Sequence, residues 1–177
     1  MSDTDERDSM YRLVRLADRH AAGMLRVLNR HIAEGFAAYP DEPVGEETIA
    51  ALLRQVADFP AVAVEAPDGV LLGFGFLRPY SPYPTFAHTA QSTIFLDPEH
   101  TRAGIGSAVL QHLEDGARER GITILLAHIS SRNPASIAFH TKHGFTHCGR
   151  FPGIGRKWGE PFDVVWMVKT LTEDNGA

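Results

Sequence analysis

The sequence predicts an α/β protein of the α+β kind, with a mixed, mostly antiparallel sheet of six to seven strands and about four helices. Two observations carry this prediction. A strand pattern at 88–96, a helix pattern after it and an almost continuously apolar run at 122–129 follow one another, which is typical of two parallel strands joined by a right-handed crossover. The other strand patterns include two pairs, 61–65 with 70–77 and 146–151 with 163–171, that we expect to be antiparallel.

The first half of the chain carries three strand patterns and two helix patterns. Residues 11–16 alternate as a first strand, and helices are expected from Asp18 to about Phe36 and over 46–56. The apolar runs on either side of Pro67-Asp68-Gly69 predict a hairpin. The proline- and aromatic-rich segment 78–85 is expected to be a rigid loop and not a domain boundary.

Two helices are expected in the second half. The first carries an apolar stripe with the helical repeat and ends near Gly121. The second runs from Asn133, a suitable cap, through Pro134 at its first position to Gly144 at its end. Both are bounded by residues typical of helix ends.

Length and composition indicate one soluble domain. The chain has 177 residues, 44% of them hydrophobic and 22% charged, and a net charge of −5. We expect a single domain over 9–171, a disordered acidic start at 1–8 and a frayed tail at 172–177. No cluster of Lys and Arg favours nucleic-acid binding, the apolar runs are too short for a membrane span, and the acidic start is unlike a signal peptide, so a cytoplasmic location is expected.

Cysteine and histidine usage predicts neither a disulfide nor a metal site. Cys148 is the only cysteine, and its aromatic-rich strand pattern favours an inert buried thiol over a nucleophile. His140, His143 and His147 lie close together in the sequence, but no Cys or carboxylate completes a familiar ligand set. No metal is therefore expected.

A glycine-containing turn lies between the strand at 88–96 and the next helix. The stretch from Asp97 to Ser107 includes Gly104 and Gly106, and Arg102 adds a positive charge beside them. Unpaired N–H groups at a helix start bind phosphates, and glycines let a ligand approach them. The P-loop pattern does not occur in the chain. The dinucleotide-binding pattern is also excluded, because the third glycine that it requires three residues after Gly106 is missing. A plain tight turn remains the alternative to a phosphate cradle.

Polar residues share one face of the helix that follows Asn133. Asn133, Ser136 and His140 recur at i, i+3 and i+7. This face is either a solvated surface or one wall of a cleft.

Together these two segments resemble the GNAT superfamily of acetyl-CoA-dependent N-acetyltransferases. The branch most similar is that of the phosphinothricin and methionine sulfoximine acetyltransferases, through residues 91–96, 133–145 and the Gly155-Arg-Lys-Trp-Gly and Asp163-Val-Val segments. The resemblance covers about 9–171 and is loose over the first sixty residues.

The resemblance implies a parallel central strand pair that is splayed to admit acetyl-CoA. In that family the pyrophosphate lies on the amides of the turn and the pantetheine arm runs along the central strand like an added strand. Lys142, which could reach the outer phosphate, could equally be a solvated surface lysine. The cofactor-binding residues it implies are Ile94, Phe95, Leu96, Arg102, Ala103, Gly104, Ile105, Gly106, Ser107, Asn133, Ser136 and Lys142.

The catalytic residues follow from the same resemblance. His140 occupies the position of a family Tyr or His, and we expect it to act as the acid for the leaving thiolate or to share the base work; a packed helix histidine is the alternative. Gln91 stands where the branch has a glutamate and cannot accept a proton at neutral pH, although it could orient a water. His88 is a second candidate base, or else a surface-loop histidine.

The acceptor site departs from the relatives. Ala87 and Pro161 stand where the branch carries Arg and Trp, which argues against a copy of the relatives' substrate. Arg78 could substitute for the missing guanidinium. Aromatic residues that could line an acceptor pocket, or be plain core, are Phe36, Tyr39, Tyr83, Phe86 and Trp158.

The sequence thus predicts an acetyl-CoA-dependent N-acetyltransferase that moves acetyl to the primary amine of a small molecule, an amino acid or an analogue, by direct attack through a tetrahedral intermediate. Two alternatives remain: a degenerate acyl-CoA-binding sensor, which the missing glutamate favours, and an acetyltransferase of protein or peptide amines. The resemblance also implies a homodimer paired through its sheets.

Overall fold

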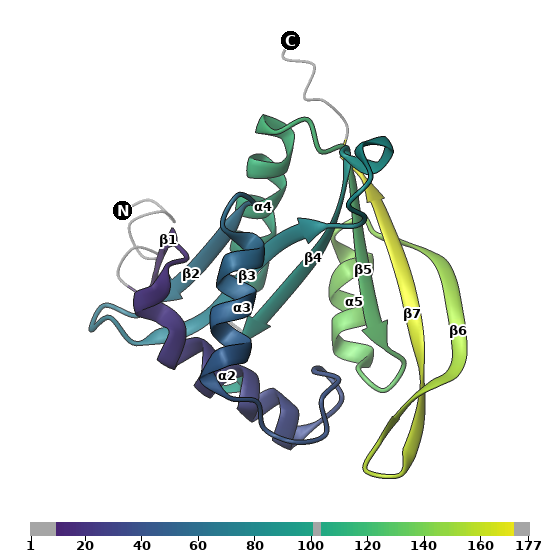
Figure 1. Cartoon of the computed structure of the whole chain (residues 1–177), viewed down its shortest axis with the longest axis horizontal. Coiled ribbons are helices and arrows are strands. Elements are labelled where there is room, and N and C mark those ends of the chain that lie inside the picture. Colours follow the sequence, from purple (N-terminus) through teal and green to yellow (C-terminus); the bar gives the residue numbers. More distant parts are fainter. Residues whose placement is uncertain (1–9, 101–103, 172–177) are drawn as a thin grey trace.

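The computed structural model describes residues 10–100 and 104–171 (Figure 1). The expected disordered start and frayed tail, and the predicted cofactor residues Arg102 and Ala103, lie outside the described residues. The elements are β1 (Arg12–Arg15), η1 (Asp18–His20), α2 (Ala21–Glu34), α3 (Glu46–Val56), β2 (Ala61–Glu65), β3 (Leu71–Pro79), η2 (Pro84–Phe86), β4 (Thr89–Leu96), η3 (Pro98–His100), α4 (Ile105–Glu119), β5 (Ile124–Ser130), α5 (Pro134–Lys142), β6 (Thr146–Lys157) and β7 (Glu160–Thr170).

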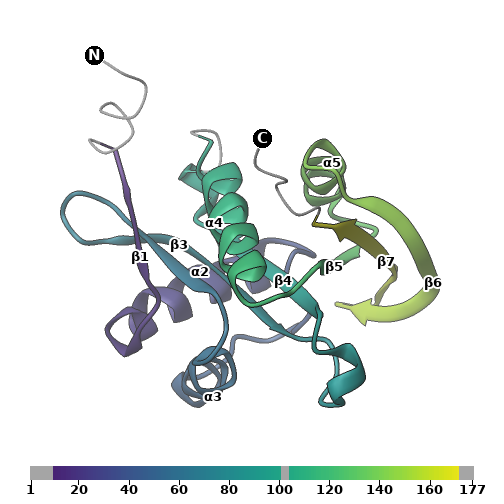
Figure 2. The same ribbon diagram turned by 90° about the horizontal axis from the view of Figure 1, so that it is seen from above.

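The described strands form one seven-stranded sheet in the order β1-β2-β3-β4-β5-β7-β6. Every neighbouring pair in it is antiparallel except β4 and β5. Helices α2 and α3 cover one face and α4 and α5 the other (Figure 2). The predicted fold class, with its parallel central pair, is confirmed.

A separate apolar core fills the space on each face of the sheet. Val27, Ile49 and Phe74 belong to the core under α2 and α3. Val109 and Leu113 belong to the core under α4, where the predicted helical stripe packs against the sheet. Side chains along β4 therefore alternate between the two cores, as the period of two requires.

The two parallel strands are paired only at their amino ends. Thr89–Gln91 of β4 lie in register with Ile124–Leu126 of β5. Beyond that point β4 stays paired with β3 as far as Leu96, and β5 stays paired with β7 as far as Ser130. Each strand follows its other neighbour, so the two diverge, as Figure 1 shows. This is the splayed pair that the family resemblance implies.

The carboxy-terminal hairpin differs from its prediction. β6 runs from Thr146 to Lys157 and β7 begins at Glu160, so paired strand replaces much of the loop expected between 151 and 163. The Pro and Gly residues in this stretch interrupt the alternation of polar and apolar residues, so the pattern did not predict the longer strand. The strand pairing accommodates them through register shifts after His147 and Phe151.

The expectation that Cys148 is buried is wrong. The cysteine is exposed, because β6 is the last strand of the sheet and neither face of its first half is covered. None of the helices described is long and apolar enough to cross a bilayer.

Candidate active site

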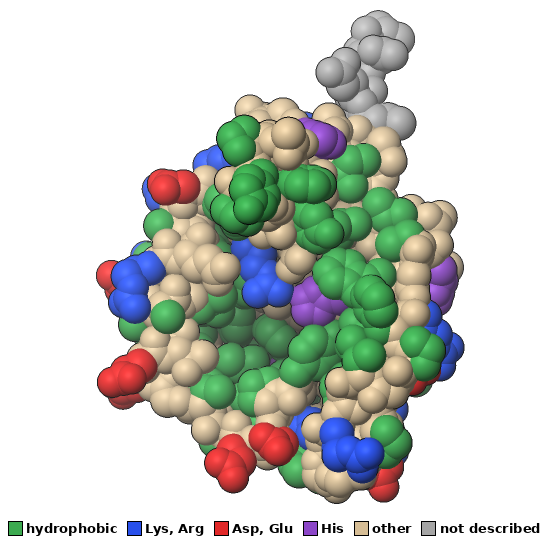
Figure 3. Space-filling view, turned by 45° about the vertical axis from the view of Figure 1, so that its right-hand side comes forward, with side chains coloured by type: hydrophobic (Ala, Val, Ile, Leu, Met, Phe, Trp, Pro, Cys, Tyr) green, Lys and Arg blue, Asp and Glu red, His purple; other side chains and the backbone are tan. Residues whose placement is uncertain are grey.

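A cavity of about 730 Å³ lies where β4 and β5 separate. Its walls come from both faces of the sheet: α4 and α5 on one side, α2 and the segment after it on the other. Figure 3 shows a hollow with hydrophobic walls, bordered by basic and histidine side chains. The predicted site residues that line the cavity are Tyr39, Arg78, Ile94, Phe95, Leu96, Gly104, Gly106, Ser107, Asn133, Ser136, His140 and Lys142.

The edge of β4 offers main-chain groups to this cavity. Along a strand the backbone groups of successive residues point to alternate sides. The Asp97 amide donates to the Leu72 carbonyl on β3, and the Phe95 carbonyl also faces β3, 2.7 Å from where a Cβ on Gly73 would lie. The backbone groups of Ile94 and Leu96 therefore point into the gap. Phe95, predicted together with them, contributes its side chain to the cavity wall instead.

The turn before α4 presents bare backbone. Gly104 caps the helix in the left-handed conformation, with φ 72°, and an added Cβ would meet nothing within 4 Å. The first α4 amide bonded to a helix carbonyl is that of Ala108, which donates to Gly104. The amides of the residues between them are therefore available to an anion at the positive end of the helix dipole. Ile105, predicted as a binding residue, turns its side chain into the core.

Close packing explains the second glycine of the turn. A Cβ on Gly106 would lie 3.2 Å from the Phe139 ring and 3.5 Å from Leu96. Phe139 in turn lies 4.3 Å from the ring of His143, whose Nε2 is 2.9 Å from the Ser107 hydroxyl. This contact joins α5 to the start of α4. From the sequence, His143 was a candidate only for a metal ligand, and its contact with Ser107 was not predicted.

Asn133 and His140 use part of their polar groups within α5. The Asn133 side chain accepts from the Ser136 amide at 3.2 Å, as a helix cap does. His140 is buried, and its Nδ1 is 2.8 Å from the Ser136 carbonyl. A carbonyl can only accept, so Nδ1 carries the hydrogen and the neutral ring keeps its lone pair on Nε2.

Burial lowers the pKa of His140, and the bond to the Ser136 carbonyl only partly opposes that shift. The ring is therefore neutral at neutral pH. A neutral imidazole with a free Nε2 is suited to accept a proton first and to donate it afterwards. The catalytic role of His140 stays a prediction.

On the α2 side of the cavity four polar side chains form a chain of hydrogen bonds. The Arg78 Nε donates to Gln91 Oε1 at 3.0 Å, and its Nη2 lies 3.0 Å from His128 Nε2. His128 Nδ1 lies 2.9 Å from the Tyr39 hydroxyl. A guanidinium can only donate, so Nε2 of His128 accepts and Nδ1 donates to Tyr39. The Tyr39 oxygen therefore accepts from His128, and the Tyr39 hydroxyl hydrogen is not used in this bond.

Burial, with the charge of Arg78 adding to it, lowers the pKa of His128 to about 4. Burial also raises the pKa of Tyr39 to about 12, although Arg78 opposes this shift. Both groups are therefore neutral at pH 7. His128 was not predicted; the signal that could have found it is a single histidine inside the apolar strand 124–129.

Several predicted residues lie outside this cavity. His88 is exposed and precedes β4, at the opposite end of that strand from the α4 turn. Tyr83 and Phe86 are 68% and 40% exposed near η2 and do not line the cavity. Gln91 touches the site through Arg78 and does not line the cavity itself.

Phe36 and Trp158 belong to an anchor for the segment after α2. Their rings are 5.7 Å apart, and Lys157 lies over Trp158 at 4.4 Å. The buried Lys157 ammonium donates to the carbonyls of Ile32, Gly35 and Ala38. The β6–β7 hairpin thereby fixes the segment that carries Tyr39.

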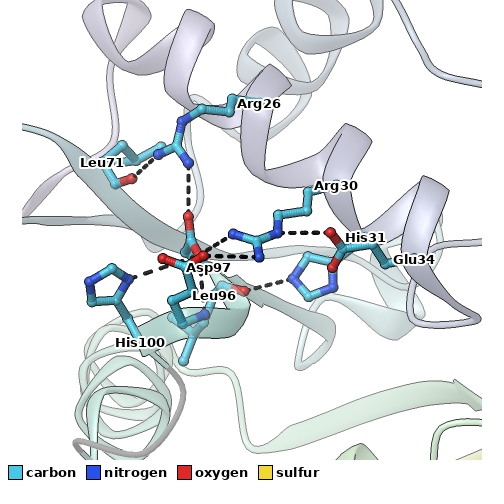
Figure 4. A network of polar contacts seen from close by, with 9 residues as sticks. Arg26, Arg30, His31, Glu34, Leu71, Leu96, Asp97 and His100 are labelled. Carbon is cyan, nitrogen blue, oxygen red and sulfur yellow. Dashed lines mark hydrogen bonds and ion pairs between the residues drawn. The ribbon is translucent and has the colours of Figure 1, made fainter.

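A second anchor joins α2 to the end of β4 (Figure 4). The buried Asp97 carboxylate accepts from Arg26 at 2.8 Å and from Arg30 at 3.0 Å. Burial alone would raise the pKa of Asp97, but these bonds and the Glu99 amide outweigh it and hold that pKa below its usual value. His31 Nε2 donates to the Leu96 carbonyl at 2.7 Å. In the part of the chain described, no group of three or more His, Cys, Asp or Glu side chains is arranged to hold a metal.

A sequence model described as the acetyltransferase (GNAT) family matches residues 24–145. The chain belongs to this family. As a GNAT-family N-acetyltransferase it is 29% identical over 164 residues to the L-amino acid N-acyltransferase MnaT of Escherichia coli, covering 92% of this chain and 94% of the relative. It is 31% identical to a phosphinothricin N-acetyltransferase of Streptomyces coelicolor, over 81% of this chain and 86% of that one.

Solved structures share the fold of this GNAT acetyltransferase. The structure of yncA from Salmonella typhimurium, determined with its cofactor acetyl-CoA, superimposes with a TM-score of 0.83 at 26% identity, over 94% of this chain and 96% of that one. The predicted family and enzyme class are confirmed.

Proposed function

We propose that this enzyme transfers the acetyl group of acetyl-CoA to the primary amine of a small molecule, an amino acid or an analogue. The observation that carries the proposal is the cavity that passes through the sheet between β4 and β5. It brings a helix start with available amides and a chamber of polar side chains into one connected space.

The residues on the α4 side suit acetyl-CoA. Gly104 leaves open space beside the amides of α4, which suits a pyrophosphate. The backbone groups of Ile94 and the amide of Leu96 suit the amides of an extended pantetheine arm lying in the gap. The Leu96 carbonyl already accepts from His31. Lys142, exposed at the cavity border, is placed for an outer phosphate. When bound, acetyl-CoA would supply the acyl thioester.

The α2 side suits a small acceptor. Arg78, His128 and Tyr39 offer polar groups, while Leu28, Phe76 and other apolar side chains form the wall around them. Lys157 donates to the carbonyl of Ala38, next to Tyr39, which restrains the segment that lines this side of the cavity. The names of the relatives, an L-amino acid acyltransferase and a phosphinothricin acetyltransferase, support an acceptor of this size.

Direct transfer requires a neutral amine and a proton donor for the leaving thiolate. The amine attacks the thioester carbon, and the C–S bond breaks from a tetrahedral intermediate. In our proposal His140 Nε2 takes the proton that the amine loses and passes it to the sulfur. Gln91 cannot share the proton transfer and holds Arg78 instead.

The test is a panel of acceptors. The protein is incubated with acetyl-CoA and free amino acids, simple amines or peptides, and the release of coenzyme A thiol is followed. We expect turnover with one or more amino acids. Turnover with peptides alone would contradict the acceptor class, and tight acetyl-CoA binding without turnover on any amine would favour the sensor.

A further inference from the structure

Arg78 brings a positive charge to the acceptor side of the cavity, and both of its side-chain hydrogen-bond partners are uncharged. They are the amide of Gln91 and the ring of His128, each at 3.0 Å. Among the described residues no carboxylate forms an ion pair with Arg78. A half-buried guanidinium without a counter-ion is an unfavourable arrangement that an anionic ligand would relieve.

Neither partner can supply the missing negative charge. Glutamine does not ionise. The two nitrogens of His128 are both engaged, one by Arg78 and one by the Tyr39 hydroxyl. The two partners therefore hold the guanidinium in place without neutralising it.

The hydrogen-bonding capacity of Arg78 is only partly used. A guanidinium has five N–H groups, and Gln91 and His128 take one each. The hydrogens that remain on the two Nη atoms form a fork that matches the two oxygens of a carboxylate. Arg78 lines the cavity, so this fork is open to a ligand there.

We propose that Arg78 binds a carboxylate carried by the acceptor next to its amine, with Gln91 and His128 as positioning residues. The acceptor is then a free α-amino acid or an analogue with an acidic group in the same place. This inference rests on the proposed function and narrows its substrate class. It excludes the amino termini of peptides and the lysine side chains of proteins, which have no free carboxylate beside the amine.

The same charge disfavours amines that lack an acidic group. Such amines are cations in neutral solution, and the uncompensated Arg78 repels a cation. An amino acid has a carboxylate that screens this repulsion and forms charge-assisted hydrogen bonds. Bonds of this kind correspond to about a 10- to 150-fold preference.

The experiment compares the best amino acid of the acceptor panel with its own α-amide, in the unaltered enzyme and in variants. We expect kcat/KM to favour the acid by about 10- to 150-fold in the unaltered enzyme. In Arg78→Met this preference should disappear, through a higher KM for the acid and, because the repulsion of the cationic amide is removed, an equal or lower KM for the amide. Arg54→Met, which removes an exposed arginine of α3, is the matched control and should keep the preference.

Gln91→Glu gives an independent test. The new carboxylate would neutralise Arg78, so KM for the amino acid should rise while kcat stays the same. A rise in kcat with an unchanged KM would instead make position 91 a base and overturn the inference. An unchanged preference in Arg78→Met would overturn it as well.

A binding measurement separates this inference from the proposed function. The shift in melting temperature caused by the amino acid is measured in the presence of saturating coenzyme A. A shift in the unaltered protein that is lost in Arg78→Met supports the carboxylate contact even if no acceptor is turned over. No shift in the unaltered protein, or equal shifts in the two proteins, contradicts the contact, whatever the enzyme assay shows.

Discussion

The two sides of the β4–β5 gap are built in different ways. On the α4 side the site consists mainly of backbone, placed by the glycine turn and by the alternation of β4. On the α2 side it consists of side chains from β3, β4, β5 and the segment after α2, held in one hydrogen-bonded chain. A backbone site tolerates changes of side chain, whereas a side-chain site changes with each substitution. In the proposed function the α4 side is the cofactor side, which relatives can therefore share, and the α2 side is the acceptor side, which can differ.

The largest effect on activity is expected at His140, which is proposed to transfer the proton between the acceptor amine and the thiolate. His140→Gln should lower kcat by about 10²–10⁴-fold, the usual contribution of one general acid or base, with little change in KM for acetyl-CoA. Steady-state kinetics measure both constants. His143→Gln, at the carboxy-terminal cap of the same helix, is the matched control: it loses the contact to Ser107 and should raise KM for acetyl-CoA with kcat nearly unchanged. Equal kcat in the His140 variant and the unaltered enzyme would remove His140 from the chemistry.

The anchor at Asp97 connects the two sides and should dominate stability. Changing Arg26 and Arg30 together to Met leaves a buried carboxylate without its two main partners. We expect the free energy of unfolding to fall by about 2–3 kcal/mol, somewhat less than for a fully buried pair because both arginines are partly exposed. Urea unfolding at pH 7 measures this, with Arg54→Met as control. A loss no greater than that of the control would show that the anchor is not structural.

The cofactor side should be sensitive to bulk at one position. In Gly106→Val the new side chain meets Phe139 and must displace α5 or fill the space beside the amides. Since overpacking costs ~1–3 kcal/mol, we expect acetyl-CoA affinity to fall about 10- to 100-fold. Calorimetry measures the affinity. Ser107→Ala leaves the backbone intact and should change affinity much less; equal losses in both would contradict a backbone cradle.

The acceptor side should be the more sensitive to acid. The pKa of His128 in the folded protein, about 4, lies below its value in an unfolded chain. The unfolded chain therefore binds more protons between these two values, and stability falls as pH drops from about 6.5 toward 4. Between pH 7.5 and 5 the free energy of unfolding should fall by about 1–2 kcal/mol less in His128→Phe than in the unaltered protein. Unfolding at the two pH values measures this. His88→Gln, which changes an exposed histidine, is the control and should lose as much stability as the unaltered protein. If His128→Phe also loses as much, the His128 ring is not held neutral in the folded protein.

Local patterns predicted the fold well, and they also explain the backbone conformations on the α4 side of the gap. Gly104, Gly106 and Asn133 each have a conformational or packing role that depends on near neighbours in the sequence. Strand bounds were predicted closely except in β6, where bulges interrupt the alternation.

The acceptor side could not be predicted to the same degree. Arg78 and Tyr39 were named as candidates, but His128 was missed, since its role depends on the register of β3, β4 and β5 together. Phe36 and Trp158 were predicted to line a pocket, and the structure places them around Lys157 instead. Aromatic composition alone does not tell a pocket wall from an anchor.

The most direct test of the gap is amide hydrogen exchange resolved by residue, with and without acetyl-CoA. The account predicts that the cofactor slows exchange at Ile94 and Leu96, whose amides face the gap, and leaves Phe95, already directed to β3, unchanged. Exchange at Ile94 and Leu96 that is unaffected by saturating acetyl-CoA would contradict the claim that the cofactor lies between β4 and β5.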